Sequence, residues 1–305
     1  MKAVFPETGG GWKKYEGNPV LGNAETGTCF DVLVTREADR SYRMDFSWRP
    51  KRALACVRSE DGIRWSAPEI YMESDPACGW IDDLNRNCIV RRGGEWHMWF
   101  TGQARGHSWI GYAKSDDGMH WKRFGDQPVL FSERPFEGPS VMNPFVLWDE
   151  EKQLFRMWYA AGETYEPNVI AYATSKDGIR WDKLPANPIF TCDKRNVCEQ
   201  ERVGACQIIP YGGWYYMFYI GYEDIDTARI CVARSRDGIT QWERHPANPI
   251  VSPTAGSWDE SACYKPSVVR DEENGRWLLW YNGRHGAPEY IGLVIHEGLD
   301  LGFDK

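Results

Sequence analysis

The chain has 305 residues, 42% of them hydrophobic and 26% charged, which is the composition of a folded globular protein. A formal net charge of −8 and the lack of a long Lys/Arg run argue against nucleic acid and anionic membranes as partners. Residues 1–11 hold one Lys and no apolar run, and no stretch approaches the roughly 18 apolar residues of a membrane helix. We therefore expect a soluble, cytoplasmic protein.

Cysteine and aromatic residues narrow the class further. The nine cysteines are an odd number without a Cys-x-x-Cys pair or a zinc-like spacing with His, so we expect free thiols and no metal site or cofactor. The 16 Trp, 15 Tyr and 12 Phe exceed ordinary usage. Such aromatic richness suits packed strands and surfaces that stack on sugar rings.

One phrase, Ser-x-Asp-Gly-x-x-Trp, recurs about every 60 residues. It stands at residues 59–65, 115–121, 175–181 and, with one residue more, 235–242. The Asp-Gly pair suits a tight turn that needs positive φ, and the Trp is placed to cover the hairpin that the turn closes. The phrase therefore predicts one β-hairpin per repeat.

Three strand-like runs precede each turn and a fourth follows it, as at residues 143–148, 154–160, 169–174 and 187–190. Four antiparallel strands per repeat indicate the blade of a propeller. The second strands align at residues 42–46, 96–100, 155–159, 215–219 and 277–281. We therefore expect an all-β fold, a five-bladed β-propeller with four antiparallel strands per blade.

The last repeat breaks off after its third strand at residues 290–295. At the N-terminus, Trp12 and residues 18–21 are spaced like Trp181 and residues 187–190. The N-terminal segment is therefore predicted to complete blade five, which closes the ring and removes an open sheet edge. A single domain is expected over residues 1–305, with blades at about 22–75, 76–131, 132–191, 192–251, and 252–305 plus 9–21.

Function is sought where the repeats disagree, because a motif present in every blade is more often scaffold than chemistry. At the mouth of the predicted channel, the blades read in register Phe30-Asp31, Arg86-Asn87, Asn143-Pro144, Ala205-Cys206 and Lys265-Pro266. Asp31 is the only carboxylate of the set. A partly desolvated inner-strand carboxylate suits a catalytic or ligand-binding role, with a structural acceptor for neighbouring amides as the alternative.

Acidic residues also crowd the rim upstream of these positions. Glu137, Glu199 and Asp259 share one aligned position, and Asp82 and Glu201 share a second, so a structural role in each blade is the alternative for all of them. The candidate catalytic carboxylates are Asp31, Asp83, Glu137 and Glu201.

The same face is rich in Arg, Asn and aromatic residues, which together with carboxylates are what a glycan site requires, although a solvated rim has a similar composition. The candidate substrate-binding residues are Trp48, Arg49, Asp82, Arg86, His107, Asn143, Arg202, Tyr264, Lys265, Arg284 and His285.

Asp45 is an exception on the second strand of blade one. The other blades have an aromatic residue at its position, namely Trp99, Trp158, Phe218 and Trp280. An ionised side chain buried there would be costly without a partner. Either Arg43 or another base therefore pairs with Asp45, or the strand is locally exposed.

The turn phrase, the aromatic second strand and the Asn-Pro-Ile tail resemble the five-bladed propeller glycosidases of glycoside hydrolase families 43, 32, 68, 117 and 130. Blade five, at residues 258–266, 280–283 and 290–292, is similar to uncharacterised relatives from bacterial polysaccharide gene clusters. In families 43 and 32, an inner-strand Asp of blade one is base or nucleophile, an Asp of blade two tunes or binds, and a Glu of blade three is the acid. The resemblance implies these roles for Asp31, for Asp82 or Asp83, and for Glu137, with Glu201 the next candidate.

The expected function is therefore a glycoside hydrolase that cleaves a glycan or oligosaccharide by two-carboxylate acid/base catalysis in the central channel. This chemistry needs no metal, and the expected partner is a carbohydrate. A glycoside phosphorylase and a non-catalytic glycan-binding propeller, which would lack a convergent carboxylate pair, are the alternatives. Catalysis through Asp31 requires Glu137 or Glu201 across the channel, about 5 to 9.5 Å away.

Overall fold

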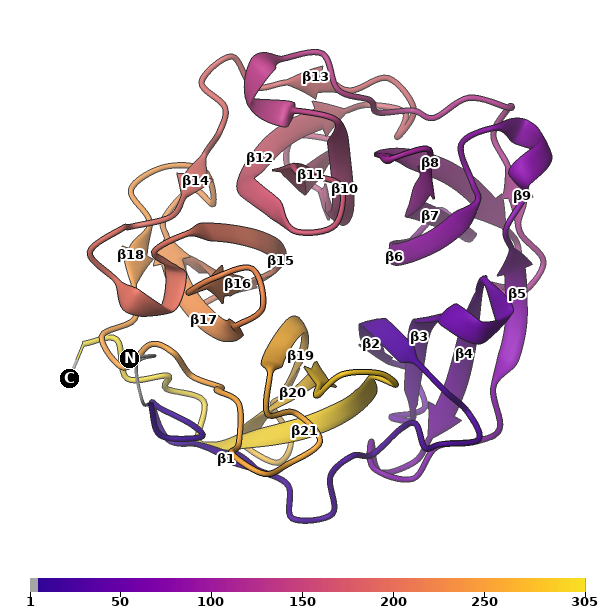
Figure 1. Ribbon diagram of the computed structural model, residues 1–305. Helices are drawn as coiled ribbons and strands as arrows, with labels where there is room; N and C mark the ends of the chain where they lie inside the picture. Colours follow the sequence, from indigo (N-terminus) through magenta and orange to yellow (C-terminus); the bar gives the residue numbers. More distant parts are fainter. Residues whose placement is uncertain (1–4, 305) are drawn as a thin grey trace.

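The computed structural model describes residues 5–304, so the two ends of the predicted domain, residues 1–4 and 305, lie outside the described residues. The described chain is all-β, and its strands form groups around a central axis (Figure 1). The helical segments within residues 5–304 are short 3-10 turns, η1 (Arg49–Lys51), η2 (Pro76–Cys78), η3 (Pro135–Glu137) and η4 (Val197–Glu199). None of the described segments is a helix long and apolar enough to cross a membrane.

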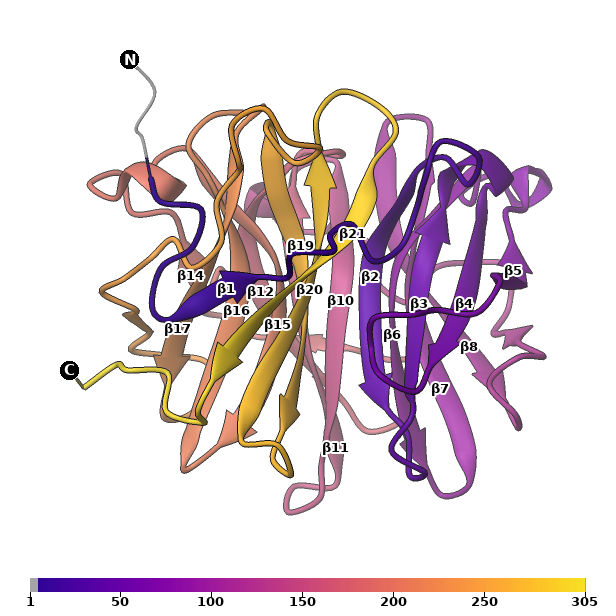
Figure 2. The ribbon, with the colours of Figure 1, turned by 90° about the horizontal axis from the view of Figure 1, so that it is seen from below.

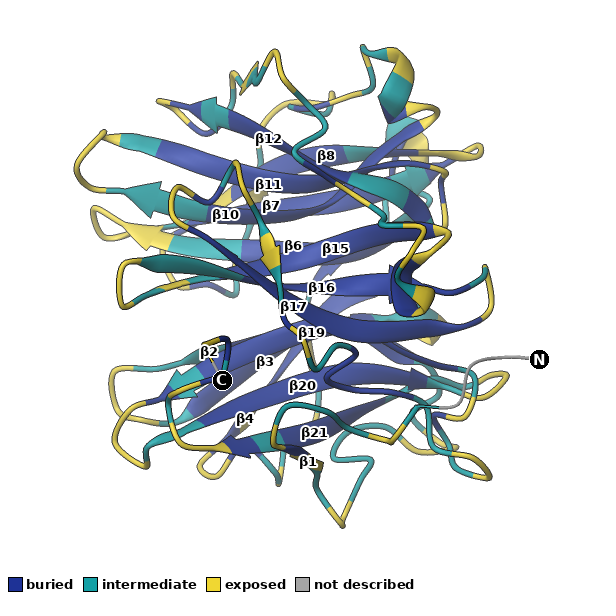
Figure 3. Ribbon diagram, turned by 90° about the vertical axis from the view of Figure 1, so that its left-hand side faces the viewer, coloured by how far each residue is buried: buried dark blue, intermediate teal, exposed yellow. Residues whose placement is uncertain are grey.

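The strands within each group are antiparallel neighbours. The first group contains β2 (Cys29–Arg36), β3 (Tyr42–Trp48), β4 (Ala53–Ser59) and β5 (Glu69–Glu73). The second contains β6 (Asp83–Arg92), β7 (Glu95–Ala104), β8 (His107–Ser115) and β9 (Lys122–Arg123). The third contains β10 (Ser140–Asp149), β11 (Leu154–Gly162), β12 (Pro167–Ser175), β13 (Asp182–Lys183) and β14 (Phe190–Thr191). The fourth contains β15 (Arg202–Tyr211), β16 (Trp214–Tyr222), β17 (Ala228–Ser235) and β18 (Glu243–Arg244). The last contains β19 (Ala262–Asp271), β20 (Arg276–Arg284), β21 (Tyr290–Glu297) and β1 (Trp12–Lys14). The middle strands of the groups are almost wholly buried, and exposed residues gather in the connecting loops (Figure 3).

The inner strand of every group carries a β-bulge. These strands, β2, β6, β10, β15 and β19, lie nearest the central axis (Figure 1), and the register with the next strand shifts in each of them. The shifts fall at Asp31, Arg86, Asn143, Ala205 and Lys265. Asp31 is therefore the counterpart of Arg86 and Asn143, which corrects by one residue the sequence register that set Phe30 against them. All of the shifted residues except Arg86 have positive φ, between 34° and 59°. Because a bulge re-aims its side chain, and positive φ is costly for residues other than Gly, these positions are built for a purpose other than strand pairing.

The Asp-Gly turns form as the sequence predicts. In the first of them, the Asp61 carboxylate accepts hydrogen bonds from the N–H groups of Ile63 and Arg64, and Gly62 adopts a φ of 75°. The carbonyl of Gly62 then accepts a hydrogen bond of 3.0 Å from the indole N–H of Trp280, in the preceding group. The same link joins Trp99 to Gly178 and Trp158 to Gly238. A second-strand Trp therefore fastens each of these turns to a neighbouring group of strands.

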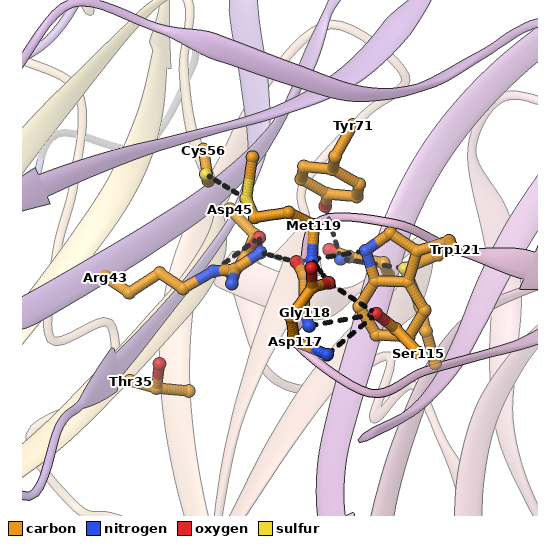
Figure 4. A network of polar contacts seen from close by, with 12 residues as sticks. Thr35, Arg43, Asp45, Cys56, Tyr71, Ser115, Asp117, Gly118, Met119 and Trp121 are labelled. Carbon is orange, nitrogen blue, oxygen red and sulfur yellow. Dashed lines mark hydrogen bonds and ion pairs between the residues drawn. The ribbon is translucent and has the colours of Figure 1, made fainter. Parts of the chain in front are cut away.

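Asp45 occupies the position of that Trp in the first group, and Arg43 pairs with it, as the first sequence alternative predicts (Figure 4). Both side chains are buried, with Arg43 Nη2 lying 2.8 Å from Asp45 Oδ1. The same Nη2 donates to the carbonyl of Gly118 at 2.9 Å. The guanidinium, held in place by Asp45, therefore replaces the indole N–H that fastens the other turns.

A buried trio of carboxylate, tyrosine and cation recurs in three groups. The carboxylate precedes the inner strand, the tyrosine hydroxyl on the second strand donates to it at 2.8 to 3.0 Å, and the cation comes from the outer strand. The trios are Glu137 with Tyr159 and Lys183, Glu199 with Tyr219 and Arg244, and Asp259 with Tyr281 and Lys14. Recurrence at one position favours the structural role that the sequence analysis leaves open for these carboxylates.

The third trio depends on the N-terminal segment. β1 lies beside β21 (Figure 2), and Trp12 is paired antiparallel with His296. Lys14 Nζ lies 2.5 Å from Asp259 Oδ2. Lys14 of β1 therefore supplies the cation of this trio, as Lys183 of β13 and Arg244 of β18 do in their own groups. The pairing that the sequence predicts between the N-terminal segment and the strand at residues 290–295 is therefore present.

Candidate active site

A cavity of about 230 Å³ opens among the inner strands and the loops at one end of them. It is lined by Thr28, Phe30, Asp31, Arg49, Asn85, Thr101, Gln103, Met142, Asn143, Thr164, Tyr165, Glu166, Tyr264, Lys265, Arg284 and Glu289. Three of the bulged positions are among these residues, so the bulges direct side chains into the cavity.

Asp31 forms part of the cavity floor and is fully buried. Its Oδ1 lies 2.9 Å from Lys265 Nζ, and its Oδ2 accepts a hydrogen bond of 3.1 Å from the backbone N–H of Arg86. Burial alone would raise the pKa of Asp31, but the ammonium and the N–H stabilise the charged form, and the pKa lies below its ordinary value. Asp31 is therefore ionised at neutral pH.

Lys265 links the bulged residues to one another. Its ammonium donates to Asn143 Oδ1 at 3.1 Å while it pairs with Asp31. The Nδ2 group of Asn143 has no hydrogen-bond partner among residues 5–304. Asn143 therefore keeps a donor for a ligand hydroxyl.

Two glutamates in the cavity have the opposite electrostatic character. Burial raises the pKa of Glu289, and the negative charge of Asp31 raises it further, although Tyr264, which donates a hydrogen bond to it, and Arg284 act against both. Burial likewise raises the pKa of Glu166, against a hydrogen bond from the Tyr222 hydroxyl. The cavity thus combines one carboxylate that ionises easily with two that keep their protons to higher pH. This divergence is what acid/base catalysis by two carboxyl groups requires.

Six of the residues expected from the sequence line this cavity: Asp31, Arg49, Asn143, Tyr264, Lys265 and Arg284. Arg86 contacts Asp31 through its backbone from beneath. The others lie outside the lining. The Trp48 indole donates a hydrogen bond to the carbonyl of Thr26, and Arg52 donates to the carbonyl of Asp82 and to the carboxylate of Asp83. A ring nitrogen of His107 is hydrogen-bonded to the carbonyl of Pro139, Glu201 forms an ion pair with Arg202, and His285 lies beside Glu260.

Glu137, for which the resemblance implies the role of the acid, is not among the residues that line the cavity. It is fully buried, and it accepts hydrogen bonds from the N–H groups of Glu133 and Arg134 in addition to its trio with Tyr159 and Lys183. With every oxygen engaged, its position favours the structural role that the sequence leaves open. Glu201, the next candidate, is exposed and pairs with the neighbouring Arg202 at 2.5 Å.

The sequence interpretation did not select Glu166 or Glu289. Both lie in loops between the second and third strands of their groups, where the repeats differ in length and composition. Each is the last residue before the third strand of its group, β12 or β21, and this shared place is the signal that could have found them. The residues that the structure describes contain no group of three or more His, Cys, Asp or Glu side chains that could hold a metal ion.

Comparison with known proteins gives the family. The profile of the glycosyl hydrolases family 43 matches residues 17–297. The uncharacterized protein Rv1502 of Mycobacterium tuberculosis is 30% identical over 238 residues, which are 72% of this chain and 74% of that protein. Among solved structures, a glycoside hydrolase superposes with a TM-score of 0.75 at 17% identity, covering 93% of this chain and 92% of the other. An exo-1,5-alpha-L-arabinanase from a bovine ruminal metagenomic library gives a TM-score of 0.65 at 18% identity, covering 90% and 94%. These structural matches show the shared fold, and the profile, which spans nearly the whole chain, shows that the protein belongs to the family 43 glycosyl hydrolases and is a glycosidase.

Proposed function

We propose that the cavity hydrolyses a glycosidic bond with Asp31 as general base and Glu289 as general acid. The observation that carries this assignment is the opposite direction of their pKa shifts within one cavity. Glu289 protonates the leaving oxygen as its bond to the anomeric carbon breaks, and Asp31 takes the proton of the water that attacks that carbon.

Glu289 is preferred over Glu166 as the acid because the charge of Asp31 acts on it. Glu289 and Asp31 are also linked through neighbouring residues of β19. The Tyr264 hydroxyl donates a hydrogen bond to Glu289, and the ammonium of the next residue, Lys265, forms an ion pair with Asp31. Asp31 is fully buried beneath Lys265, so the ammonium must move toward the substrate before Oδ1 can accept a proton.

The test is turnover of a panel of aryl glycosides and oligosaccharides by the wild type and by D31N, E289Q and E166Q. D31N keeps the shape but not the charge, and it should lower turnover at least about a hundredfold with little change in stability. E289Q should lose activity on glycosides with poor leaving groups and keep it on dinitrophenyl glycosides, which need no protonation. E166Q is the matched control.

Three results would contradict this proposal. If E166Q rather than E289Q depends on the leaving group, Glu166 is the acid. If turnover requires inorganic phosphate, the enzyme is a phosphorylase. If the panel is bound but never cleaved, the binding-propeller alternative holds.

We also propose that the groups of strands are the five blades of one propeller, a single domain that the N-terminal segment closes. The ladder between β1 and β21 and the ion pair between Lys14 and Asp259 support this closure. All nine cysteines are free, which suits the reducing cytoplasm that we propose as its location. Cell fractionation tests the location.

A further inference from the structure

Arg49 lines the cavity, but its positive charge has no part in the acid/base chemistry proposed above. Its Cζ atom lies 4.6 Å from the centroid of the Phe30 ring, and Phe30 precedes Asp31 in β2. Stacking on a ring face leaves the N–H groups at the edge of a guanidinium available for a ligand. Arg49 therefore presents hydrogen-bond donors and a positive charge beside the segment that carries the proposed base.

The protein balances the charge of Arg49 only in part. Asp83 Oδ2 lies 3.5 Å from Arg49 Nη1, but the same carboxylate accepts a hydrogen bond of 3.1 Å from Arg52 Nε. Arg49 Nη2 reaches the side-chain oxygen of Asn85 at 3.4 Å, which is longer than a typical hydrogen bond. Among the ion pairs of residues 5–304, the two arginines therefore share a single carboxylate, and one positive charge is left over.

The backbone places Arg49 next to the proposed acid. The N–H of Arg49 donates to the carbonyl of Thr28 at 3.1 Å, and the N–H of Glu289 donates to Thr28 Oγ1 at 3.2 Å. One residue of the cavity lining thus holds both. Because the guanidinium also stacks on the neighbour of Asp31, a sugar that lies between Asp31 and Glu289 is within reach of Arg49.

The lining of the cavity is positively charged in the form that is active in the proposed reaction. Its basic residues are Arg49, Lys265 and Arg284, and its acidic residues are Asp31, Glu166 and Glu289. A general acid must hold its proton before the bond breaks, so Glu289 is then neutral and at most two negative charges face three positive ones. Arg284 forms no ion pair within the part of the chain that the structure describes, and its hydrogen bond goes to a backbone carbonyl.

We propose that the sugar whose glycosidic bond is cleaved carries an acidic group, and that Arg49 binds this group. The proposal rests on the hydrolytic function of the cavity and narrows the substrate to an anionic glycoside. A guanidinium fits the paired oxygens of a uronic acid carboxylate, and a sulfate or phosphate ester on the sugar offers the same charged oxygens. Hydroxyl groups alone would leave the excess positive charge of the cavity unbalanced.

The test compares aryl xylosides, glucosides and glucuronides in both anomers, which differ in the group on C5: hydrogen, hydroxymethyl or carboxylate. Aryl galactosides and galacturonides form a second series, and the 6-sulfate and 6-phosphate of each neutral hexoside identify the acidic group. We expect kcat/KM for at least one acidic probe to exceed that for its neutral counterpart about tenfold or more.

The variant R49Q should reduce this preference about tenfold. K51Q is the matched control, because Lys51 is exposed, lies in the same short helical turn as Arg49 and is not part of the cavity lining. It removes the same charge from the protein and should keep the preference. High salt should lower kcat/KM for the acidic probe more than for the neutral one.

If no acidic probe is preferred, or if R49Q and K51Q change the preference alike, the proposal is wrong. A rate that depends on added inorganic phosphate would also overturn it, because Arg49 would then serve a phosphate co-substrate rather than an acidic group of the sugar.

Binding separates this inference from the proposed function. E289Q mimics the protonated acid and keeps the ion pair between Asp31 and Lys265, so it is titrated calorimetrically with methyl glycosides of the acidic and neutral sugars. About tenfold tighter binding of an acidic glycoside, lost in E289Q/R49Q, supports the inference even if the wild type cleaves none of the aryl probes. Equal binding of acidic and neutral glycosides overturns it, whereas failure of the proposed function appears as a wild type that cleaves no probe.

Discussion

Lys14 offers a direct measurement of how the N-terminal segment holds the structure together. Its ammonium contacts Asp259 at 2.5 Å, Thr254 Oγ1 at 2.7 Å and the carbonyl of Ser252 at 2.8 Å. Asp259 is 1% exposed, so K14M would leave a buried carboxylate with Tyr281 as its main remaining donor. Removing one partner of such a buried pair costs about 3 to 5 kcal/mol.

For a chain of this size, the melting temperature shifts by roughly 2 °C per kcal/mol, so K14M should melt about 6 to 10 °C below the wild type. Differential scanning calorimetry measures the shift. K183M and R244M are the matched variants, because Lys183 and Arg244 contribute the cation to the other two trios. All three variants should lose stability to a similar extent.

The double variant K14M/D259N removes both charges and should recover part of the loss, since the cost comes from the unpaired carboxylate. If K14M melts like the wild type while K183M and R244M do not, β1 does not complete the last group in solution. The reasoning would also fail if K14M and the double variant melted at the same reduced temperature.

Four further predictions concern the N-terminal segment and the cavity. Deletion of residues 1–21 should lower the melting temperature of the whole domain, since it leaves the outer edge of β21 unpaired, and an unchanged melt would refute closure. The pH dependence of kcat/KM should be bell-shaped, falling as pH drops through the lowered pKa of Asp31 and as it rises through the raised pKa of Glu289. In K265M the acid limb should move to higher pH, because the ammonium that lowers the pKa of Asp31 is gone, and an unmoved limb would mean that Asp31 is not the base. Because the pKa of Glu289 is higher in the folded than in the unfolded state, its ionisation lowers the free energy of unfolding as pH rises from the ordinary glutamate pKa to the raised one. E289Q should therefore resist urea better than the wild type near neutral pH, but not below the ordinary glutamate pKa.

The scaffold was predictable because its signals are local and repeated. The Asp-Gly turns, the second strands and the pairing of β1 with β21 follow from spacing along the chain, and Arg43 was a named partner for Asp45. Asp31 could be singled out because it is the only carboxylate among the dipeptides that the sequence aligns at the channel mouth, although that alignment is one residue out of register with the bulges. Repetition is what makes these features readable.

The proposed acid, Glu289, was not predictable in the same way. Glu137 carries a local resemblance to a family motif, but its partners Tyr159 and Lys183 come from distant strands, and their arrangement, which favours a structural role, shows only in the structure. The raised pKa of Glu289 depends on burial and on Asp31, more than 250 residues away in the chain. The sequence did offer one indication against Glu137 as the acid, because Glu137, Glu199 and Asp259 share one aligned position and a repeated residue is more often structural.

The bulges in the inner strands bear on how such a protein can diverge. At these positions the backbone, not the neighbouring side chains, sets the direction of the residue, and residues as unlike as Asp31, Asn143 and Lys265 occupy equivalent places without altering the ladders around them. Chemistry at the channel can therefore change one residue at a time while the hydrophobic layers between groups stay as they are. With such a backbone, mutations at the bulged positions alter substrate or mechanism, and mutations in the hydrophobic layers alter folding. New activities can therefore arise without passing through a variant that fails to fold.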